Sequence, residues 1–584
     1  IDYYNILLNR QYSIMDLKGV DSMKRLSIGI EDFKELIDKD AYYVDKTKFI
    51  ANCINEKCIL YTRPRRFGKT LNMSMLYYFF SNKEKENAYL FDNLAISKNK
   101  EAMKHQNKYP TLFITLKEMK RIHLEDQKKQ FRTQISLCAK KYLELLDSPH
   151  LLESEKRLFK LYATEEIDLN ELSNSLFNLS YYLYKHYQQK VIILIDEYDV
   201  PLQSAYQNSY YDEMVDFIRA ILSSALKTNN ALEKGVLTGC LRISKESVFT
   251  GLNNFNTNSL LDTISSDCFG FTNEEIDELL KYYNLTSYKD EIKHWYNGYL
   301  FGKLEIYNPW STLMYVNRKL DDPDFVPISF WANTSGNEII YNYIENASPA
   351  LREEFEQLLQ GKSLIKEIKQ DLTYNEMDNI NNVYSFLLLT GYLKIKSRIE
   401  AVDDYNPNNT ITKYELVIPN KEVSEIHRQK FIDYFNDFVD LKKNDLYQAM
   451  IQGQEEKVND LLDDILERSI SYYDNYEAFY HGFLVGLFND YAVESNQEAG
   501  KGRFDVCIFP KRIRDTLVLI ECKHSSNEEN LIEDSKEGIK QIINKKYLIN
   551  PRIKKYENNV CYSISFYKKQ CYVTKLKSKN HSIR

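Results

Sequence analysis

The sequence predicts a multidomain α/β protein with a parallel-sheet domain in its N-terminal half, a largely helical middle and a second α/β domain at its C-terminus. Three features lead to this prediction: a short apolar strand followed by a glycine–lysine loop and a helix, a longer apolar run that ends in two acids, and a late strand with an acid and a lysine on one face. At 584 residues the chain is too long for one hydrophobic core and suggests about three domains.

The composition narrows the functional classes. Hydrophobic residues make up 43% and charged residues 28% of the chain, as in an ordinary globular protein. The nine cysteines show no CxxC spacing, no apolar run approaches the length of a membrane span, and the first residues lack the layout of a signal peptide. We therefore expect a cytoplasmic protein with reduced thiols and no membrane partner. The net charge of −7 argues against a protein that coats nucleic acid, although a local basic patch would still permit binding.

The first candidate site starts with a buried strand at Cys58–Tyr61, followed by the loop TRPRRFGKT and a helical stretch, Leu71–Phe80. Backbone N–H groups at the start of such a helix point at phosphate groups, and the helix dipole favours an anion there. Lys69 would reach the β- and γ-phosphates of ATP, and the Thr70 hydroxyl would hold Mg²⁺. Arg63 stands where the general motif has its first glycine, so a basic surface turn remains the alternative.

A second segment supports a nucleotide site. Val191–Ile195 is a continuous apolar run followed by Asp196 and Glu197, as in a central parallel strand that is buried on both faces. Asp196 would complete the Mg²⁺ shell, and Glu197 would orient the attacking water. A core strand followed by an acidic turn fits any α/β domain, but the two motifs occur in the right order with one further strand, Thr111–Leu116, between them.

A further strand at Gly235–Gly239 follows a helix expected at Tyr211–Lys227 and places Thr238 where a polar residue senses the γ-phosphate. Arg219 or Arg242 could stabilise charge during hydrolysis, but the sequence does not choose between them, and a surface arginine is the simpler interpretation of each. The candidate residues for nucleotide binding are Arg65, Arg66, Phe67, Gly68, Lys69, Thr70, Asp196 and Thr238, and Glu197 is the candidate catalytic acid.

The middle of the chain, residues 272–443, is expected to be mostly helical with short strands. Thr272 is a good N-cap for an amphipathic helix over the residues that follow it. Leu387–Ile395 and Tyr414–Ile418, on either side of the turn-rich stretch 403–409, suggest a β-hairpin wing. Aromatic turns such as WYNGY and YNPWS are interpreted mainly as core or interdomain packing, with base stacking as the alternative.

Near the C-terminus, Glu521 and Lys523 follow the apolar run LVLI and project to the same side of one strand, because side chains alternate with period two. If Phe504–Phe509 is the neighbouring strand, Asp505 comes close to this pair, and two acids with an ammonium group can seat a divalent metal ion and an activated water. That chemistry cuts a phosphodiester bond. An ordinary charged strand face is the alternative, and the flanking basic residues fit either a phosphate track or a solvated surface. The flanking residues are Lys511, Arg512, Arg514, Lys545, Lys546, Arg552, Lys554 and Lys555.

The C-terminal pattern resembles the PD-(D/E)XK nuclease superfamily, with Asp505, Glu521 and Lys523 as its signature. This resemblance implies Glu477, in an upstream helix, as a third metal-binding acid and Gln541, in a later helix, as a further catalytic residue. The segments RPRRFGKT, LIDEYDVP, TGCLRISKESVFTGLNN, WYNGYLFG, YNPWS and FWANTSGN resemble the bacterial AAA-ATPase-like family, whose members often carry a C-terminal PD-(D/E)XK domain. An arginine at the position of the first loop glycine matches the habit of that family.

The resemblance implies four parts: an N-terminal extension (1–25), a P-loop ATPase domain of the AAA/ASCE type with a parallel sheet (26–271), a helical lid with a winged-helix-like region (272–443) and a PD-(D/E)XK α/β nuclease-like domain (444–584). The expected function is an ATP-binding protein that couples the ATPase to a Mg²⁺- or Mn²⁺-dependent nuclease. DNA is favoured over RNA as the partner, a homo-oligomer is possible, and a role in defence or mobile-element biology is suggested by analogy. The alternative is a nucleotide-dependent switch or binding module whose nuclease fold binds nucleic acid or protein without cutting.

Overall fold

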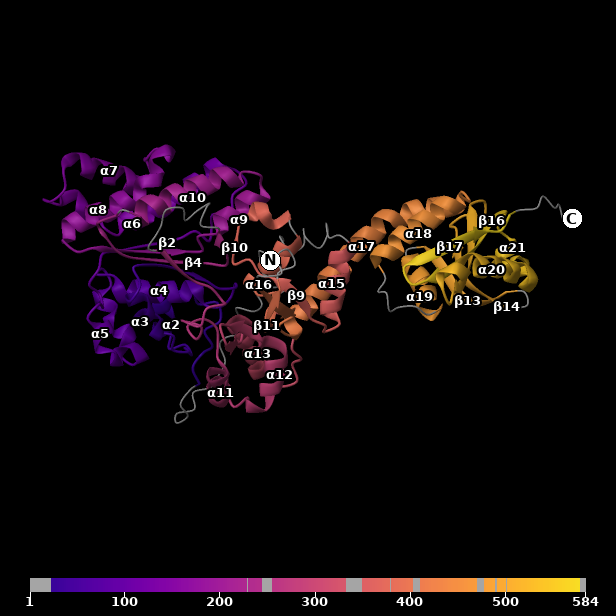
Figure 1. Cartoon of the computed structure of the whole chain (residues 1–584), viewed down its shortest axis with the longest axis horizontal. Helices are drawn as coiled ribbons and strands as arrows, with labels where there is room; N and C mark the ends of the chain where they lie inside the picture. Colours follow the sequence, from indigo (N-terminus) through magenta and orange to yellow (C-terminus); the bar gives the residue numbers. More distant parts are fainter. Residues whose placement is uncertain are drawn as a thin grey trace. The chain divides into compact units, whose positions relative to one another are not determined.

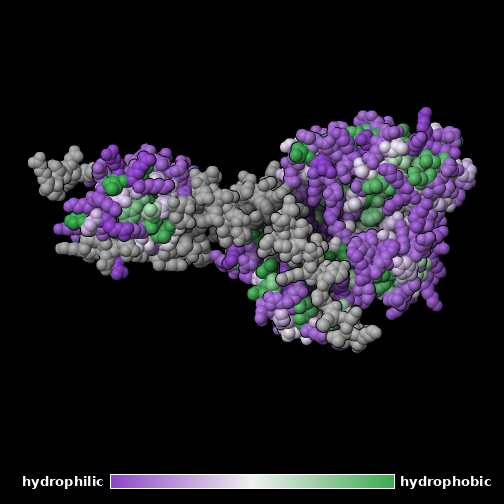
Figure 2. Space-filling model, turned by 180° about the vertical axis from the view of Figure 1, so that it is seen from behind, coloured by the Kyte–Doolittle hydropathy of each residue, from purple (hydrophilic) through white to green (hydrophobic). Residues whose placement is uncertain are grey.

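The computed structural model describes residues 23–227, 229–243, 255–331, 349–378, 380–402, 410–469, 477–488, 491–499 and 502–577. The chain divides into two compact units, of which one combines 1–337 with 361–426 and the other combines 338–360 with 427–584. Within the described part of the chain, every helix falls short of the length or the apolar character that a bilayer crossing demands. Hydrophilic residues dominate the face shown in Figure 2.

The first unit is built on a five-stranded parallel sheet. In spatial order its strands are β2 (Thr111–Thr115), β3 (Val191–Asp196), β4 (Leu232–Gly239), β1 (Cys58–Thr62) and β6 (Phe255–Asn258). β1 and β3 are buried along their whole length, as expected for parallel strands that helices cover on both faces. The predicted parallel sheet of the N-terminal half is therefore confirmed.

Helices lie on both faces of this sheet. They are α2 (Phe33–Asp38), α3 (Lys48–Ile54), α4 (Lys69–Phe80), α5 (Lys100–Met103), α6 (Leu124–Lys140), α7 (Glu153–Thr164), α8 (Ser175–Tyr187), α9 (Val200–Gln207) and α10 (Tyr211–Leu226). In Figure 1, α2, α3 and α4 lie on one side of the sheet and α6, α8 and α10 on the other. The helix α4 starts directly after the loop that follows β1, at the carboxyl edge of the strands, where open α/β sheets bind their ligands.

The rest of the first unit contains short helices and strands. They are β5 (Arg242–Ile243), α11 (Asn273–Tyr282), α12 (Lys289–Tyr296), β7 (Tyr299–Phe301), β8 (Leu304–Ile306), α13 (Pro309–Asp321), β9 (Leu364–Glu367), β10 (Asp371–Leu372), α16 (Ile380–Leu389), β11 (Lys394–Val402) and β12 (Thr410–Val417). The Thr272 hydroxyl accepts a hydrogen bond from Glu275 N at 3.3 Å and caps α11 as expected. Tyr296 and Tyr307, from the aromatic motifs, are fully buried in the core around α11, α12 and α13, so the packing interpretation is confirmed for them.

The β-hairpin expected in this region is present, but its first strand was placed wrongly. β11 and β12 pair antiparallel, whereas residues 387–389 form the end of α16 and β11 begins only at Lys394. The apolar run FLLL has no alternation that distinguishes a strand from a buried helix. Gly391, with φ of +91°, follows the end of the helix in the left-handed conformation. The expected turn at 403–409 lies outside the described residues.

The second unit is built on a mixed five-stranded sheet. In spatial order its strands are β13 (Ala492–Ala499), β14 (Gly502–Phe509), β15 (Thr516–His524), β16 (Asn558–Tyr567) and β17 (Gln570–Lys575), and only β15 and β16 are parallel. Its helices are α15 (Pro349–Leu359), α17 (Lys421–Ile451), α18 (Glu455–Ser469), α19 (Glu477–Leu487), α20 (Leu531–Lys545) and α21 (Pro551–Lys554). Apolar side chains of α17, α18 and α19 pack on one face of the sheet and those of α20 on the other, which confirms the second α/β fold. The chain passes from the first unit to the second within α17, between residues 426 and 427, and the expected boundary at 443/444 lies later in the same helix.

Candidate functional site

The loop between β1 and α4 turns tightly in front of the helix. Arg66 and Gly68 have positive φ angles of +69° and +83°, and Gly68 is the N-cap of α4. A side chain at Gly68 would be strained at this φ, so the turn needs the backbone freedom of glycine. The first backbone N–H groups of α4 are thereby left facing the space in front of the helix, where an anion is favoured.

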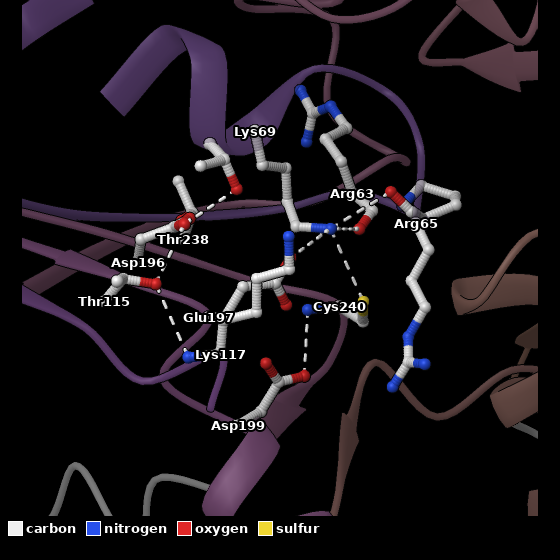
Figure 3. A network of polar contacts seen from close by, with 12 residues as sticks. Arg63, Arg65, Lys69, Thr115, Lys117, Asp196, Glu197, Asp199, Thr238 and Cys240 are labelled. Atoms are coloured by element: carbon white, nitrogen blue, oxygen red, sulfur yellow. Dashed lines mark hydrogen bonds and ion pairs between the residues drawn. The ribbon is translucent and has the colours of Figure 1, made fainter. Parts of the chain in front are cut away.

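Lys69 is the first residue of α4, and its side chain is only 3% exposed. Its ammonium group donates to the main-chain oxygens of Arg63 and Pro64, each at 3.2 Å, and lies 3.3 Å from Glu197 Oε1. Figure 3 shows these groups converging from the loop and the end of β3. Burial alone would lower the pKa of Lys69, but the acids around it, Glu197 among them, raise this pKa above its ordinary value. The loop therefore holds a buried cation that stays charged.

Asp196 is the last residue of β3 and is fully buried. Its Oδ2 accepts a hydrogen bond from Thr70 Oγ1 at 2.8 Å, and its Oδ1 accepts one from Thr238 Oγ1 at 2.5 Å. Burial and the charge of Glu197 raise the pKa of Asp196 to about 6, while the two hydroxyl groups act to lower it. The oxygens of Thr70 and Asp196 suit Mg²⁺, which prefers oxygen ligands. Thr238 is fully buried, and its hydroxyl orients the Asp196 carboxylate.

A cavity of about 260 Å³ opens beside this loop, and all of its lining residues belong to the first unit. The lining includes the loop and first helical residues 65–72, most of them polar or basic, and Glu197. A further part of the lining, the apolar wall, comes from four separate segments, of which only the aromatic turn YNPWS, with Trp310, was singled out in the sequence. A nucleotide has the same division, since its phosphates are polar and its base is flat and apolar on both faces. The apolar wall contains Ile28, Val44, Phe271, Trp310 and Leu313.

The basic and aromatic residues of the loop lie differently around this cavity. Arg65 Nη2 donates to Gln203 Oε1 at 2.6 Å, and the Arg66 guanidinium lies 4.4 Å from the centre of the Trp310 ring. Both arginines line the cavity. Phe67 is buried, with its ring against the aromatic residues of β7, so its side chain anchors the loop.

Arg63, which replaces the first glycine of the general motif, is a fully buried structural residue. Its guanidinium donates to the main-chain oxygen of Asn258 at 2.9 Å and to the Asn258 side chain at 2.6 Å. It also lies over the rings of Phe269 and Phe301, at 5.0 and 5.3 Å. Arg63 thus ties the loop to β6 and does not line the cavity. The sequence did not reveal this role, because Asn258 is 195 residues away.

Two arginines considered for charge stabilisation lie outside the cavity wall. Arg219 pairs with Asp216 at 2.7 Å, and Arg242 pairs with Asp371 at 2.5 Å. Asp199 is a functional candidate that the sequence analysis missed, although the motif DEYD contains it. This buried carboxylate accepts hydrogen bonds from two backbone N–H groups after β4, at 2.8 and 3.0 Å, and so fixes that turn beside the lysine of the loop.

In the second unit, the adjacent strands β14 and β15 bring two acids to the same level of the sheet. The antiparallel register includes the pair Val506 and Ile520, and one further step places Asp505 across from Glu521. Asp505 Oδ2 accepts a hydrogen bond from the Cys522 backbone N–H at 2.8 Å, which joins the two strands beyond their last paired residues. The predicted approach of Asp505 to the Glu521 strand is therefore observed.

Glu521 is almost completely buried, with 1% of its side chain exposed. Lys523 Nζ lies 3.2 Å from Glu521 Oε1 and donates to Gln541 Oε1 at 2.9 Å. Gln541, on α20, also donates from Nε2 to Glu521 Oε1. The structure thus brings Asp505, Glu521, Lys523 and Gln541 together at the face of the sheet that α20 covers.

Three further residues shape this cluster. His481, on α19, has its Nε2 3.0 Å from the main-chain oxygen of Asp505. Gln541 Nε2 donates to the Tyr547 hydroxyl at 3.2 Å, and burial, together with the nearby acids, raises the pKa of Tyr547. A Cβ atom at Gly538 would lie 1.9 Å from Ser563 Oγ and 3.5 Å from Glu521 Cγ. Only glycine therefore lets α20 approach the strands this closely, and a glycine inside a helical stretch was the available sequence signal.

The oxygen donors of this cluster suit a hard divalent cation such as Mg²⁺ or Mn²⁺. Asp505 and Glu521 supply two carboxylates from neighbouring strands. Glu477 is the first residue of α19, but its side chain lies outside the described part of the chain. Among the described residues, no group of three or more His, Cys, Asp and Glu side chains is arranged to hold one metal ion.

Comparison with known proteins agrees with the division of the chain into two units. Residues 27–249 match a family model described as predicted AAA-ATPase, and residues 475–576 match the PD-(D/E)XK nuclease superfamily. An uncharacterized protein in the vnfD 5′ region of Azotobacter chroococcum mcd 1 is 25% identical over 408 residues, which is 69% of each chain. The chain thus carries a segment in its first unit that matches an AAA-ATPase-like model and a C-terminal segment in its second unit that matches the PD-(D/E)XK nuclease superfamily.

Proposed function

We propose that this protein is an ATP-regulated nuclease that cuts phosphodiester bonds with the help of a divalent metal ion. The observation that carries the proposal is the convergence of Asp505, Glu521 and Lys523, two acids and an ammonium group, beside α20. An acid buried as deeply as Glu521 is costly unless its charge is used or compensated. Lys523 compensates part of this charge, and a cation would compensate the rest.

Each residue of the nuclease cluster has a proposed task. Asp505 and Glu521 would hold Mg²⁺ or Mn²⁺, which supplies a Lewis acid for the phosphate and lowers the pKa of a bound water. Lys523, a quarter exposed, would stabilise the negative charge that develops on the phosphate. Gln541 keeps Lys523 and Glu521 in a fixed relation through its two hydrogen bonds. Glu477 remains a proposed third acid.

The charge balance supports a nucleic-acid partner. Residues 475–584 contain 19 Lys and Arg against 13 Asp and Glu, whereas the whole chain has a net charge of −7. The basic residues that flank the cluster in the sequence, among them Lys511, Arg512, Lys545 and Lys554, are exposed to solvent. Exposed cations attract a phosphate backbone without reading its sequence. DNA is proposed ahead of RNA.

At the other site, ATP would bind with its phosphates at the loop and its base against the apolar wall of the cavity. Lys69 would bind the β- and γ-phosphates, and Thr70 with Asp196 would hold Mg²⁺. Lys69 is paired with Glu197 at 3.3 Å, so incoming phosphates would compete for the lysine and release Glu197 to orient a water. The proposed ATPase domain is 26–271, the lid 272–443 and the nuclease domain 444–584. All nine cysteines are buried and lie outside any disulfide, which supports a reducing, cytoplasmic environment.

A cleavage assay tests the proposal. The full chain is incubated with plasmid DNA, single-stranded DNA and RNA, with Mg²⁺ or Mn²⁺, and with and without ATP, beside Glu521→Gln and Lys69→Ala. Glu529→Gln serves as the matched control, because it removes an exposed acid of the same domain. We expect metal-dependent cleavage that Glu521→Gln abolishes and Glu529→Gln preserves. Cleavage by Glu521→Gln at the wild-type rate would exclude the assignment.

The second candidate is a nucleotide-dependent switch whose nuclease fold binds nucleic acid or protein without cutting. It is favoured by the presence of only two acids, Asp505 and Glu521, at the described part of the cluster, and by the acidic net charge of the chain. The same assay separates the candidates, since a switch would turn over ATP and shift the mobility of labelled DNA without producing fragments.

A further inference from the structure

A buried carboxylate lies at the start of the helix that leads into the second unit. Glu422 is the second residue of α17, and its side chain has no exposed surface. Its Oε1 accepts three hydrogen bonds: from Ser311 Oγ at 2.8 Å, from Phe330 N at 2.9 Å and from Trp331 N at 3.0 Å. Its Oε2 is buried without a hydrogen-bond partner among the described residues. One oxygen of the carboxylate thus accepts three hydrogen bonds while the other accepts none, so the carboxylate has room for a second hydrogen-bonding arrangement.

One set of contacts connects this carboxylate to the phosphate-binding loop through α13. The guanidinium of Arg66 lies 4.4 Å from the centre of the Trp310 ring, within the range of a cation–π interaction. The next residue, Ser311, donates its hydroxyl to Glu422. Arg66 also lines the cavity, so its guanidinium is available to a phosphate group.

A second set of contacts starts at the next residue of the loop. The ring of Phe67 packs edge-on against Tyr299, with centroids 4.9 Å apart, and Tyr299 packs against Trp331 at 6.2 Å. The backbone N–H of Trp331 donates to Glu422. The two adjacent loop residues are thus linked to the same carboxylate oxygen by two independent routes, all within the first unit.

We propose that Glu422 is a positioning residue through which the nucleotide site controls the first turn of α17, and that this turn is the output of ATP binding toward the nuclease. The inference rests on the proposed function, because it requires ATP at the loop. A ligand shifts a structure only through contacts that differ between two states. A polyphosphate supplies that difference by attracting Arg66 away from the Trp310 ring, which loosens the Ser311 contact to Glu422 and frees the start of α17.

Hydrogen–deuterium exchange on the full chain tests the proposal, with Mg²⁺ and a non-hydrolysable ATP analogue as the ligand. In the wild-type protein the analogue slows exchange over residues 66–72 and speeds exchange over residues 421–426 by at least about fivefold, the lower range of an allosteric coupling. In Glu422→Ala, residues 421–426 exchange fast with and without the analogue. Glu422→Gln keeps the response to the analogue at residues 421–426, because its amide oxygen accepts the same three hydrogen bonds.

Ser311→Ala keeps the test decisive if Glu422→Ala folds poorly. It removes one small hydroxyl and should reduce the response of residues 421–426 to less than half. Ser136→Ala is its matched control, since Ser136 is equally buried and donates to Ala163 O at 2.8 Å elsewhere in the unit. Slow exchange over residues 191–196 in each variant shows that the sheet is intact.

The outcomes separate this inference from the proposed function. A response at residues 66–72 with unchanged exchange at 421–426 overturns the inference and leaves ATP binding standing. A wild-type response in both Glu422→Ala and Ser311→Ala also overturns it. The absence of any response at residues 66–72 in the wild type overturns the proposed ATP site, and the inference with it.

Discussion

The two sites of this chain use the same pair of residues with opposite burial. In the first unit Lys69 lies 3.3 Å from Glu197, and in the second Lys523 lies 3.2 Å from Glu521. The lysine is the buried partner in the first pair, at 3% exposed against 15% for the glutamate. The glutamate is the buried partner in the second, at 1% against 25% for the lysine.

The buried partner indicates what each site is prepared to bind. A buried charge is stable only while it is compensated, and the exposed partner is the one that a ligand can replace. A polyanion can replace Glu197 beside Lys69, which suits ATP. A cation can join or replace Lys523 beside Glu521, which suits a divalent metal ion. Two Lys–Glu pairs of similar length therefore suit ligands of opposite charge, a polyanion in the first unit and a metal cation in the second.

The largest effect on stability is expected from Arg63, the second buried cation of the loop beside Lys69. Arg63→Gly restores the general loop glycine but removes a fully buried guanidinium and leaves Asn258 without its donor. We expect the free energy of unfolding of the first unit to fall by about 3–5 kcal/mol, as when one partner of a buried polar contact is deleted. Urea denaturation measures it, with Arg121→Gly, at an exposed position, as the control. Unchanged stability with tighter ATP binding would show that Arg63 is not structural.

Glu521→Gln tests the buried anion of the second site. It keeps the shape of the side chain but removes the charge that would hold a metal ion, so DNA cleavage should fall by at least about 100-fold, the loss typical of a deleted charge-stabilising group. ATP turnover should stay within about twofold of wild type, since this substitution lies in the second unit and the proposed ATP site lies in the first. A loss of ATP turnover as large as the loss of DNA cleavage would show that the two sites are coupled.

Glu422→Gln tests a buried acid that, unlike Glu521, has no cation among its hydrogen-bond partners to compensate its charge. Burial raises its pKa from 4.5 to about 7. The pKa of the folded state is therefore above that of the unfolded state, and the stability present below about pH 4.5 is lost as pH rises toward 7. At pH 8 the substitution should stabilise the first unit by about 3 kcal/mol, and at pH 4 it should have little effect. Urea midpoints at the two pH values measure this, and a pH-independent difference would contradict it.

Thr238→Val should produce the smallest effect. It preserves the volume of the side chain and removes one hydrogen bond to the Asp196 carboxylate, a change worth about 1 kcal/mol, so ATP turnover should fall about fivefold. That hydrogen bond lowers the pKa of Asp196, so the loss should be greater at pH 6 than at pH 8. Thr133→Val, at a half-buried position of α6 in the same unit, is the matched control. A turnover equal to wild type at both pH values would remove Thr238 from the site.

Local patterns predicted the elements that carry both sites. The strands that end in Asp196 and contain Glu521 are apolar runs bounded by charges, and period two placed Glu521 and Lys523 on one face. The partners that these elements find across the fold could not be predicted. Arg63 contacts Asn258 and Glu422 contacts Ser311, which are 195 and 111 residues away. No local periodicity encodes such contacts, which depend on how whole elements pack.

Metal binding by Asp505 and Glu521 is the sharpest test of the proposed nuclease site. Mn²⁺ is titrated into the full chain without nucleotide, and free Mn²⁺ is measured by electron paramagnetic resonance in the wild type, Asp505→Asn, Glu521→Gln and Lys69→Ala. We expect one Mn²⁺ site per chain that both acid variants lose and that Lys69→Ala retains. Wild-type Mn²⁺ binding in Asp505→Asn and Glu521→Gln would contradict it.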